Sequence, residues 1–386
     1  MTPAARAQAA IEIVDQVIAS ARNDGPPADA LVSAYFKTRR YAGSKDRRAV
    51  RELVFRAVRY IAEVPENGRT AMLAIAPELF NGSPHGPAPI GEGERAAAAG
   101  VLPGWLEGEL SPLVSEGEWP ALLERAPLDL RANLLKASRD ALLPEWPEAV
   151  LTGLSPWGLR LPADTAVTSH PAYLDGRVEV QDEGSQLVAL ACEARDGERI
   201  VDLCAGAGGK ALALAAAAPD AELIAGDVNR QRLSQLLPRA ERAGAEIATR
   251  LLNPPREAEE LSDLHGRCDL VLVDAPCSGS GTWRRNPEGR WRLTPERLER
   301  LLALQARVLD LAAPLVKPGG RLVYAVCSVL GREGAGQAAA FLSRHSGFEA
   351  RDIPFTAGRS DGVGRLLTPR QDGTDGFFIA RFGASC

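Results

Sequence analysis

The chain has few of the residues that build metal centres and disulfide frameworks. Its six cysteines occur without paired CxxC spacing and its four histidines form no HExxH motif, so we predict neither a metal site nor disulfide bonds. No apolar run reaches the length of a membrane span, and the N-terminus lacks the apolar core of a secretory signal. We therefore expect a cytoplasmic protein with reduced cysteines and no membrane contact.

Lysine is also scarce, because it supplies only five of the 45 basic residues. The formal net charge of −5 argues against wholesale binding to a polyanion and leaves only local patches. One patch lies in 37–59, where nine basic residues accompany two acidic ones, whereas 63–120 holds nine Glu and two Arg. A basic helical segment of this kind favours contact with nucleic-acid phosphates. A solvated, arginine-rich helix is the alternative.

The pattern of apolar residues predicts several domains. Apolar residues recur at helical spacing in 5–62, and the segment 82–104 has the Gly- and Pro-rich composition of a loop or linker. Short strand and helix patterns alternate from Leu128 onwards, and a longer series begins near Gln181. We predict a helical domain, a small α/β module and a catalytic domain, at 1–126, 127–180 and 181–386.

The catalytic domain has the pattern of a doubly wound, mostly parallel sheet with helices on both faces. Its first strand, 200–203, precedes a tight turn with three glycines in 206–209 and a helix over 210–218. Such glycines let the backbone approach a ligand, and the new helix offers unpaired N–H groups. Asp227 ends the next apolar run and is placed to bind ribose hydroxyls. The stretch therefore predicts a nucleotide-cofactor site.

This turn alone leaves two cofactors open. Gly206, Gly208 and Ala211 fit the G-x-G-x-x-G/A pattern of dinucleotide sites. NAD and an adenosine-carrying methyl donor are therefore equally compatible with it. A phosphate-binding P-loop is excluded, because Ala211 stands where a Ser or Thr would hold magnesium and Cys204 stands where the first glycine should be.

Two later strands end in cysteine-containing sequences, Asp274-Ala-Pro-Cys277 and Val326-Cys327. In the usual doubly wound order these strands are neighbours, so both thiols would face the crevice that holds the glycine turn. A hydride transferase has no need for two thiols and a carboxylate at that edge. A pyrimidine methyltransferase does have such a need, and this difference favours the methyl donor over NAD.

The chemistry of cytosine explains the need. Carbon 5 is a poor nucleophile, and a thiolate that adds temporarily at carbon 6 makes the ring electron-rich. A carboxyl group such as Asp274 can hydrogen-bond to N3 and the exocyclic amine and so lower the barrier. A second thiol could assist product release. This chemistry does not say whether Cys277 or Cys327 attacks, and two buried structural cysteines are the alternative.

Five motifs in the C-terminal half carry a family resemblance. They are Val180–Gln186, Asp202–Lys210, Gly226–Leu233, Asp274–Gly281 and Cys327-Ser328. Together they resemble the RsmB/Sun family of RNA (cytosine-5)-methyltransferases, which use S-adenosylmethionine. The resemblance implies a Rossmann-like class I methyltransferase domain.

The same resemblance implies roles for individual residues. Cys327 would be the nucleophile, Cys277 the release-assisting thiol, and Asp274 would lie between methyl donor and base. Asp227 would hold the ribose of the donor. Asn253 stands where the family usually has an Asp that contacts the adenine amine, and its carbonyl oxygen can still accept that bond. The rest of the donor site would be formed by Cys204, Ala205, Gly206, Ala207, Gly208, Gly209 and Lys210.

RNA contacts are expected from two further segments. The N-terminal helices resemble the NusB-like RNA-binding domain of bacterial RsmB-type enzymes, which fits the basic segment 37–59. Trp283 and Trp291 could stack on bases, although packing on the sheet is the favoured interpretation. Four arginines after the Pro-Cys loop are predicted to hold RNA phosphates, with a surface ion-pair cluster as the alternative: Arg284, Arg285, Arg290 and Arg292.

We therefore expect an enzyme that methylates carbon 5 of a cytosine in structured RNA. Ribosomal RNA is the favoured substrate, and the target base would be flipped into the crevice. An NAD-dependent dehydrogenase and a non-catalytic RNA-binding scaffold are the competing interpretations.

Overall fold

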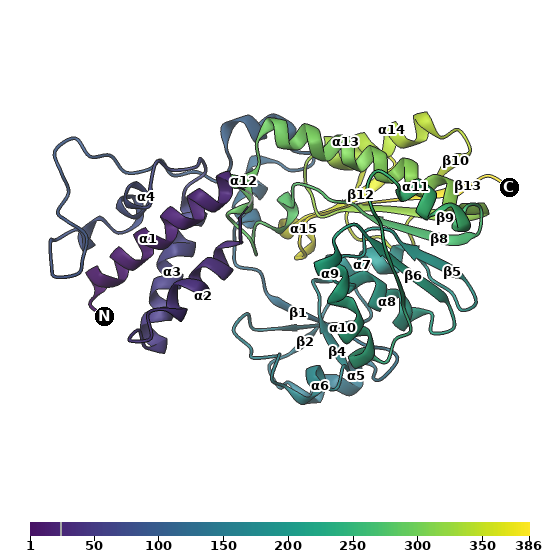
Figure 1. Ribbon diagram of the computed structural model, residues 1–386, viewed down its shortest axis with the longest axis horizontal. Coiled ribbons are helices and arrows are strands. Elements are labelled where there is room, and N and C mark those ends of the chain that lie inside the picture. Colours follow the sequence, from purple (N-terminus) through teal and green to yellow (C-terminus); the bar gives the residue numbers. More distant parts are fainter. Residues whose placement is uncertain (24) are drawn as a thin grey trace. The chain divides into compact units, whose positions relative to one another are not determined.

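The computed structural model describes residues 1–23 and 25–386, which form two compact units (Figure 1). The helical unit comprises Met1–Leu110, Ser115–Glu124 and Thr282–Leu298. The sheet unit comprises Ser111–Val114, Arg125–Gly281 and Glu299–Cys386. The predicted three-domain division stays a prediction.

The helical unit confirms the helical spacing of the N-terminal sequence. Thr2 caps its first helix by accepting from the Ala5 N–H, and Asn67 and Thr70 form a capping box at its fourth. Ile13, Val17 and other apolar residues of the first helix are fully buried against the third and fourth helices. The four helices are α1 Pro3–Arg22, α2 Ala28–Lys37, α3 Ser44–Tyr60 and α4 Gly68–Ile75. Shorter helical turns are Pro77–Leu79, Gly104–Glu109, Glu116–Leu122 and α12 Gly289–Arg292.

Arg290 is used inside the helical unit, and the prediction that it holds RNA phosphates is wrong. Its side chain is 1% exposed, and its guanidinium donates to the backbone carbonyl oxygens of Val58, Arg59, Ile61 and Val101. Burial lowers its pKa to about 9, with a smaller contribution from the nearby Arg59 charge. The carbonyl groups at the end of α3 thus take the donors that were expected to face RNA.

The neighbouring residues of α12 also join the helical unit. Trp291 is buried in its apolar core and donates its ring N–H to the Ile61 carbonyl oxygen at 3.1 Å. Arg292 donates to the carbonyl oxygens of Gly25 and Pro26 at 2.7 and 2.6 Å. Trp291 therefore packs as an aromatic core residue, on helices rather than on the sheet.

A small antiparallel sheet begins the sheet unit and matches the expected α/β module. Its strand order is β2-β3-β1-β4, and Leu130, Leu159 and Val178 are buried on it. The strands are β1 Leu128–Ala132, β2 Val150–Leu151, β3 Gly158–Leu161 and β4 Val178–Val180. Its helices are α5 Arg139–Leu142, continued by the turn Leu143–Glu145, and α6 Pro171–Leu174.

The large sheet confirms the doubly wound prediction. Its order is β11-β12-β13-β9-β8-β5-β6-β7, with β10 paired to β13, and the pairings from β7 to β9 are parallel. The strands are β5 Arg199–Asp202, β6 Glu222–Asp227, β7 Ala248–Leu251, β8 Cys268–Asp274, β9 Val316–Val326, β10 Phe348–Arg351, β11 Arg359–Asp361, β12 Gly364–Leu367 and β13 Phe377–Ala384. The hairpin of β11 and β12 was not expected from the sequence.

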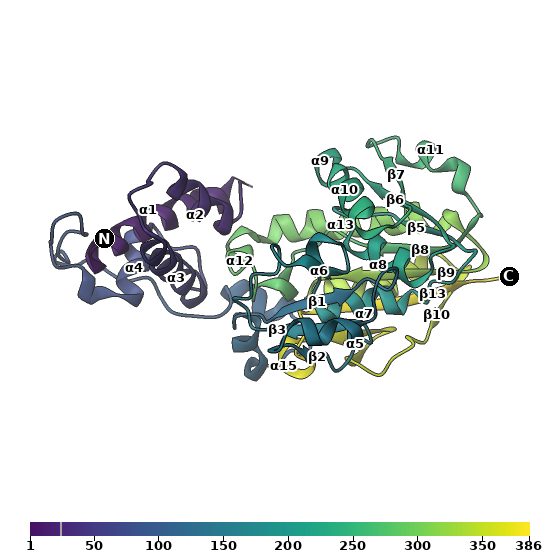
Figure 2. The same cartoon turned by 90° about the horizontal axis from the view of Figure 1, so that it is seen from below.

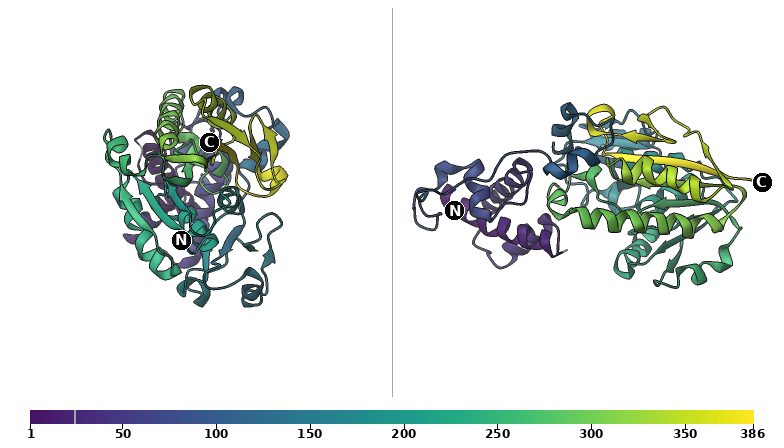
Figure 3. Two further views of the ribbon diagram at one scale, coloured as in Figure 1. Left: turned by 90° about the vertical axis from the view of Figure 1, so that its right-hand side faces the viewer. Right: turned by 90° about the horizontal axis from the view of Figure 1, so that it is seen from above.

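Helices cover both faces of this sheet, which explains why Leu270–Val273 is apolar without alternation. One face carries α7, α8 and α10 (Figures 1 and 2), and the other carries α13 and α14 (Figure 3). The helices are α7 Glu183–Ala191, α8 Gly209–Ala217, α9 Arg230–Ser234, α10 Leu236–Ala243, α11 Glu257–Glu260, α13 Pro295–Ala312, α14 Gln337–Arg344 and α15 Pro369–Asp372. Gln235 separates α9 from α10. Within the described ranges, no helix is long and apolar enough to span a membrane.

Candidate active site

The glycine turn lies between β5 and α8, as predicted. Gly206 and Gly208 have positive φ angles of 55° and 83°, which glycine adopts without strain. A Cβ atom at Gly208 would lie 2.5 Å from Cγ of Leu236. The turn therefore requires glycine for its backbone conformation and for its close approach to α10.

Asp227 ties the turn to the end of β6. Its carboxylate accepts from the backbone N–H of Gly206 at 2.7 Å and from that of Asn229 at 2.6 Å. The side chain is mostly buried. A carboxylate at this position, beside a glycine turn, is the arrangement that binds ribose hydroxyls in open α/β sheets.

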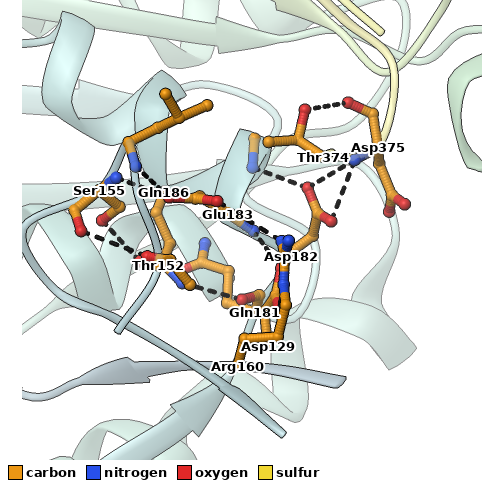
Figure 4. A network of polar contacts seen from close by, with 12 residues as sticks. Asp129, Thr152, Ser155, Arg160, Gln181, Asp182, Glu183, Gln186, Thr374 and Asp375 are labelled. Atoms are coloured by element: carbon orange, nitrogen blue, oxygen red, sulfur yellow. Dashed lines mark hydrogen bonds and ion pairs between the residues drawn. The ribbon is translucent and has the colours of Figure 1, made fainter. Parts of the chain in front are cut away.

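The motif Val180–Gln186, at the start of α7, contacts the glycine turn, and Figure 4 shows part of its polar network. Gln181 Nε2 donates to the Gly209 carbonyl oxygen at 3.3 Å. Asp182 caps α7 through the Gly184 N–H at 2.7 Å and accepts from the Asp375 N–H at 3.1 Å. The motif thus connects the start of α8 with the start of β13.

Lys210 and Asp274 form a mostly buried ion pair at the edge of the sheet. The Lys210 Nζ and Asp274 Oδ2 atoms are 2.7 Å apart, and the lysine side chain is 10% exposed. Burial works against the lysine charge, but the charge and the hydrogen bond of Asp274 outweigh it and raise the pKa of Lys210. This lysine is therefore paired with Asp274 and is not a solvated charge.

The two thiols meet at the ends of neighbouring strands. Asp274 pairs with Ala325 in the register of β8 and β9, and the Sγ atoms of Cys277 and Cys327 beyond them are 3.4 Å apart. Both side chains are half-buried. The hydrogen bond to Cys327, burial and the negative charge of Glu333 raise the pKa of the Cys277 thiol well above its usual value. This arrangement holds a protonated thiol against a second sulfur.

The remaining cysteines lie apart from this pair. Burial raises the pKa of Cys192 and of Cys204, and Cys268 is also buried. Cys204 lies in the glycine turn, where it was predicted to line the donor site. Cys386 is exposed at the C-terminus.

Asn253 lies beyond β7 and is exposed. Its backbone N–H and its Nδ2 donate to the two carboxylate oxygens of Glu260, at 2.7 and 2.9 Å. Because the amide nitrogen is committed to Glu260, recognition of an adenine amine would use the Asn253 carbonyl oxygen. Its role in donor binding stays a prediction.

Sequence reasoning missed Glu333, which contacts the residues next to both thiols. Glu333 accepts from Ser278, Ser328 and Gln305. A single Glu in a Gly-rich segment carries no motif. The available signal is that a serine follows each of the two cysteines directly, which suggests that both loops share a polar partner.

The order of the large sheet, the glycine turn after β5 and the acidic residue that ends β6 define a Rossmann-like class I methyltransferase fold. Residues 189–383 match the family model described as 16S rRNA methyltransferase RsmB/F. The chain belongs to this family. Family membership favours the methyltransferase interpretation over the dehydrogenase.

Curated relatives show the same likeness. The chain is 36% identical over 287 residues to ribosomal RNA small subunit methyltransferase B of Enterobacter sp. (strain 638), which covers 72% of this chain and 65% of the relative. The corresponding protein of Pasteurella multocida is 34% identical over 289 residues, with 72% and 64% covered. The chain thus spans slightly less than two thirds of the length of these relatives.

Solved structures extend the likeness of the fold. A methyltransferase homologue of Pyrococcus horikoshii is 25% identical with a TM-score of 0.61, and 72% of this chain and 92% of that chain are covered. NSun6 of the same organism, solved with SFG, is 20% identical with a TM-score of 0.62 and coverages of 69% and 93%. A further crystal structure, 22% identical, covers 97% of this chain and 98% of its own with a TM-score of 0.76. Its likeness therefore includes the helical unit.

Proposed function

We propose that this protein transfers a methyl group from S-adenosylmethionine to carbon 5 of a cytosine in ribosomal RNA. The observation that carries the proposal is the contact of Cys277 and Cys327 at 3.4 Å, beside Asp274 and at the edge that holds the glycine turn. The family description and the names of the relatives support ribosomal RNA of the small subunit as the substrate.

The residues of the glycine turn fit the methyl donor. Gly206 and Gly208 have the positive φ angles of a tight turn and pack closely against Arg232 and Leu236, and Asp227 provides a carboxylate for ribose hydroxyls. S-adenosylmethionine, when bound, supplies an electrophilic methyl group. Lys210 keeps the Asp274 carboxylate in place at 2.7 Å, where it can hydrogen-bond to the amine of a flipped cytosine.

We assign the covalent steps to the two thiols. The Cys327 thiolate forms a bond to carbon 6 of the base, which makes carbon 5 nucleophilic toward the methyl group. For release, the proton on carbon 5 is removed as the bond between sulfur and carbon 6 breaks: the electron pair of the C5–H bond forms the C5=C6 double bond, and the C6–S pair leaves on the Cys327 sulfur. The Cys277 thiol passes its proton to the departing Cys327 sulfur, and the resulting Cys277 thiolate takes the proton from carbon 5. The raised pKa of Cys277 makes its thiolate a strong base for this last step.

Single substitutions of the two cysteines test the proposal. Cys327→Ala should lower methyl transfer from labelled S-adenosylmethionine to small-subunit ribosomal RNA by roughly 10³-fold or more, because the thiol assigned to attack carbon 6 is removed. Cys277→Ala should accumulate a covalent protein–RNA adduct, visible as a shifted band in a denaturing gel. Cys386→Ala, which changes an exposed cysteine, serves as the control. Normal release by Cys277→Ala with no trapped adduct would refute the assignment.

We also infer that the exposed basic side chains of α3 bind RNA phosphates. Lys45, Arg47, Arg48 and Arg56 are exposed on this helix, and Arg51 pairs with Asp29 at its surface. Each phosphate contact removed should reduce the slope of log affinity against log salt by about 1. Binding of ribosomal RNA by Lys45→Ala and Arg48→Ala across a salt series measures this, and unchanged slopes would exclude α3 as the contact.

A further inference from the structure

Glu333 is a buried carboxylate that accepts four hydrogen bonds. It lies in the π-helical turn Arg332–Gly336 after β9, and it is 0% exposed. Its Oε1 accepts from the Ser278 N–H at 2.8 Å and from Gln305 Nε2 at 2.9 Å. Its Oε2 accepts from the hydroxyl of Ser328 at 2.6 Å and from that of Ser278.

These four bonds join the two cysteine loops. Ser278 follows Cys277 and Ser328 follows Cys327, so one carboxylate holds the residue next to each sulfur. Two further contacts hold the same loops together. Gln305 Nε2 also donates to the carbonyl oxygen of Pro276 at 3.0 Å, and the Gly281 N–H donates to the carbonyl oxygen of Cys327 at 3.0 Å.

Ser280 completes the network from the Pro-Cys side. Its hydroxyl lies 2.9 Å from that of Ser328 and accepts from the Val329 N–H at 2.9 Å. The Ser328 hydroxyl in turn accepts from the Leu330 N–H at 3.0 Å. The hydroxyls of Ser278, Ser280 and Ser328 thus each accept from a backbone N–H of these two loops. Those of Ser278 and Ser328 also donate to Glu333.

We propose that Glu333 is a positioning residue that sets the separation of the Cys277 and Cys327 sulfurs and thereby the release half of the reaction. This inference rests on the proposed function for its kinetic part and on the geometry alone for its structural part. A rigid separation matters because release requires a proton to pass between the two sulfurs, and displacements of about 1 Å can cost roughly 10²-fold in rate.

Both oxygens of Glu333 face donors. Oε1 faces the Ser278 N–H, which cannot accept, and Gln305 Nε2, which also donates to the Pro276 carbonyl oxygen. Oε2 faces the hydroxyls of Ser278 and Ser328. A glutamine at this position would keep the size, remove the charge and turn its NH2 group toward these hydroxyls, which could then no longer donate to residue 333. Glu333→Gln therefore tests the hydrogen bonds with little change in volume.

Oxidative cross-linking measures the separation of the sulfurs without methyl transfer. Diamide takes two electrons and two protons from a pair of thiols, which forms one S–S bond and reduces its N=N bond to a hydrazine. In a Cys386→Ala background, diamide should link Cys277 to Cys327, as read by mass spectrometry of peptides. Glu333→Gln should slow this cross-link by roughly tenfold, and Ser328→Ala, which removes one bond only, should slow it less.

Glu257→Gln is the matched control. Glu257 is 3% exposed and binds Arg307, so it is a buried glutamate of the same unit that touches neither cysteine loop in the described contacts. Its cross-linking rate should equal that of the parent. An unchanged rate in Glu333→Gln would overturn the proposal. This outcome is independent of the proposed function, because the measurement uses neither RNA nor S-adenosylmethionine.

The kinetic readout separates positioning from a general structural role. With ribosomal RNA as substrate, Glu333→Gln should lower kcat by roughly tenfold or more, raise the fraction of enzyme held as covalent adduct, and leave KM for S-adenosylmethionine unchanged. If the variant only reduced the amount of active enzyme, with the adduct fraction of the parent, the carboxylate would be structural and the proposal would be wrong.

Discussion

Two buried carboxylates of the sheet unit differ in the number of hydrogen bonds that they accept. Glu333, beside the thiols, accepts four hydrogen bonds, whereas neither oxygen of Asp202, at the end of β5, accepts a bond of good geometry from the described residues. The Cys204 N–H favours the Asp202 charge only slightly. Burial and the nearby Asp274 charge therefore raise the pKa of Asp202 to about 7. The same functional group is thus held by four donors in Glu333, whereas in Asp202 it lacks such donors and its pKa is raised.

The largest expected effect comes from Asp202→Asn and concerns stability. Because the pKa of Asp202 is raised from 3.8 to about 7 on folding, the folded state binds the extra proton between these values. The wild type should therefore lose about 4 kcal/mol of stability relative to the variant as the pH rises from about 4 to about 8, through the folded-state pKa, with no further change above. Calorimetric thermal midpoints of both proteins across this range measure the difference.

Asp129→Asn is the control, because Asp129 is a buried carboxylate whose hydrogen bonds are satisfied. Asp129 is as buried as Asp202, but it forms two hydrogen bonds with Arg160, at 2.7 and 2.9 Å. Its substitution should lower stability, because it removes the nearer of the two carboxylates that pair with a partly buried guanidinium, with Glu183 remaining at 3.4 Å. If Asp202→Asn behaved in the same way, with no dependence of the difference on pH, the contrast between unsatisfied and satisfied carboxylates would fail.

The contrast also explains what the sequence could predict. The predicted site of the methyl donor is built from residues close in sequence, so the glycine turn and Asp227 were recognisable from local spacing. The proximity of the two thiols followed from the usual strand order of doubly wound sheets. Glu333 binds Ser278 across 55 residues, through side chains on separate loops. No local pattern indicates such a bond. Arg290 was misread for the same reason, since its acceptors Val58, Arg59 and Ile61, in and directly after α3, lie more than 200 residues earlier in the chain.

The ion pair of Lys210 and Asp274 connects the helix after the glycine turn with the strand that leads to the thiols. Lys210→Met should have the next largest effect. The substitution leaves the Asp274 carboxylate without its partner at 2.7 Å and close to Asp202. We expect methyl transfer to fall by roughly 10²-fold, because the carboxylate is then misplaced for the amine of the base. Single-turnover methylation of ribosomal RNA measures this.

Lys317→Met is the matched control for this prediction. Lys317 also pairs with an aspartate of the sheet unit, Asp269, but the lysine side chain is 45% exposed. Loss of an exposed pair has little effect on stability and should leave methyl transfer unchanged. Equal rates for the two variants would show that the Lys210 pair is structural and would remove it from the site.

The smallest expected effect concerns Asn253, whose pairing is exposed. Two hydrogen bonds from Asn253 lower the pKa of the Glu260 carboxyl group, so Glu260 stays charged beside this residue. Asn253→Asp would place a second carboxylate there and should raise KM for S-adenosylmethionine by roughly threefold. Adding Glu260→Gln should restore the affinity, because the amide of Gln can donate to the new aspartate. If Asn253→Asp alone bound the donor more tightly, Glu260 would not control this position, and the donor side would depend on the adenine contact alone.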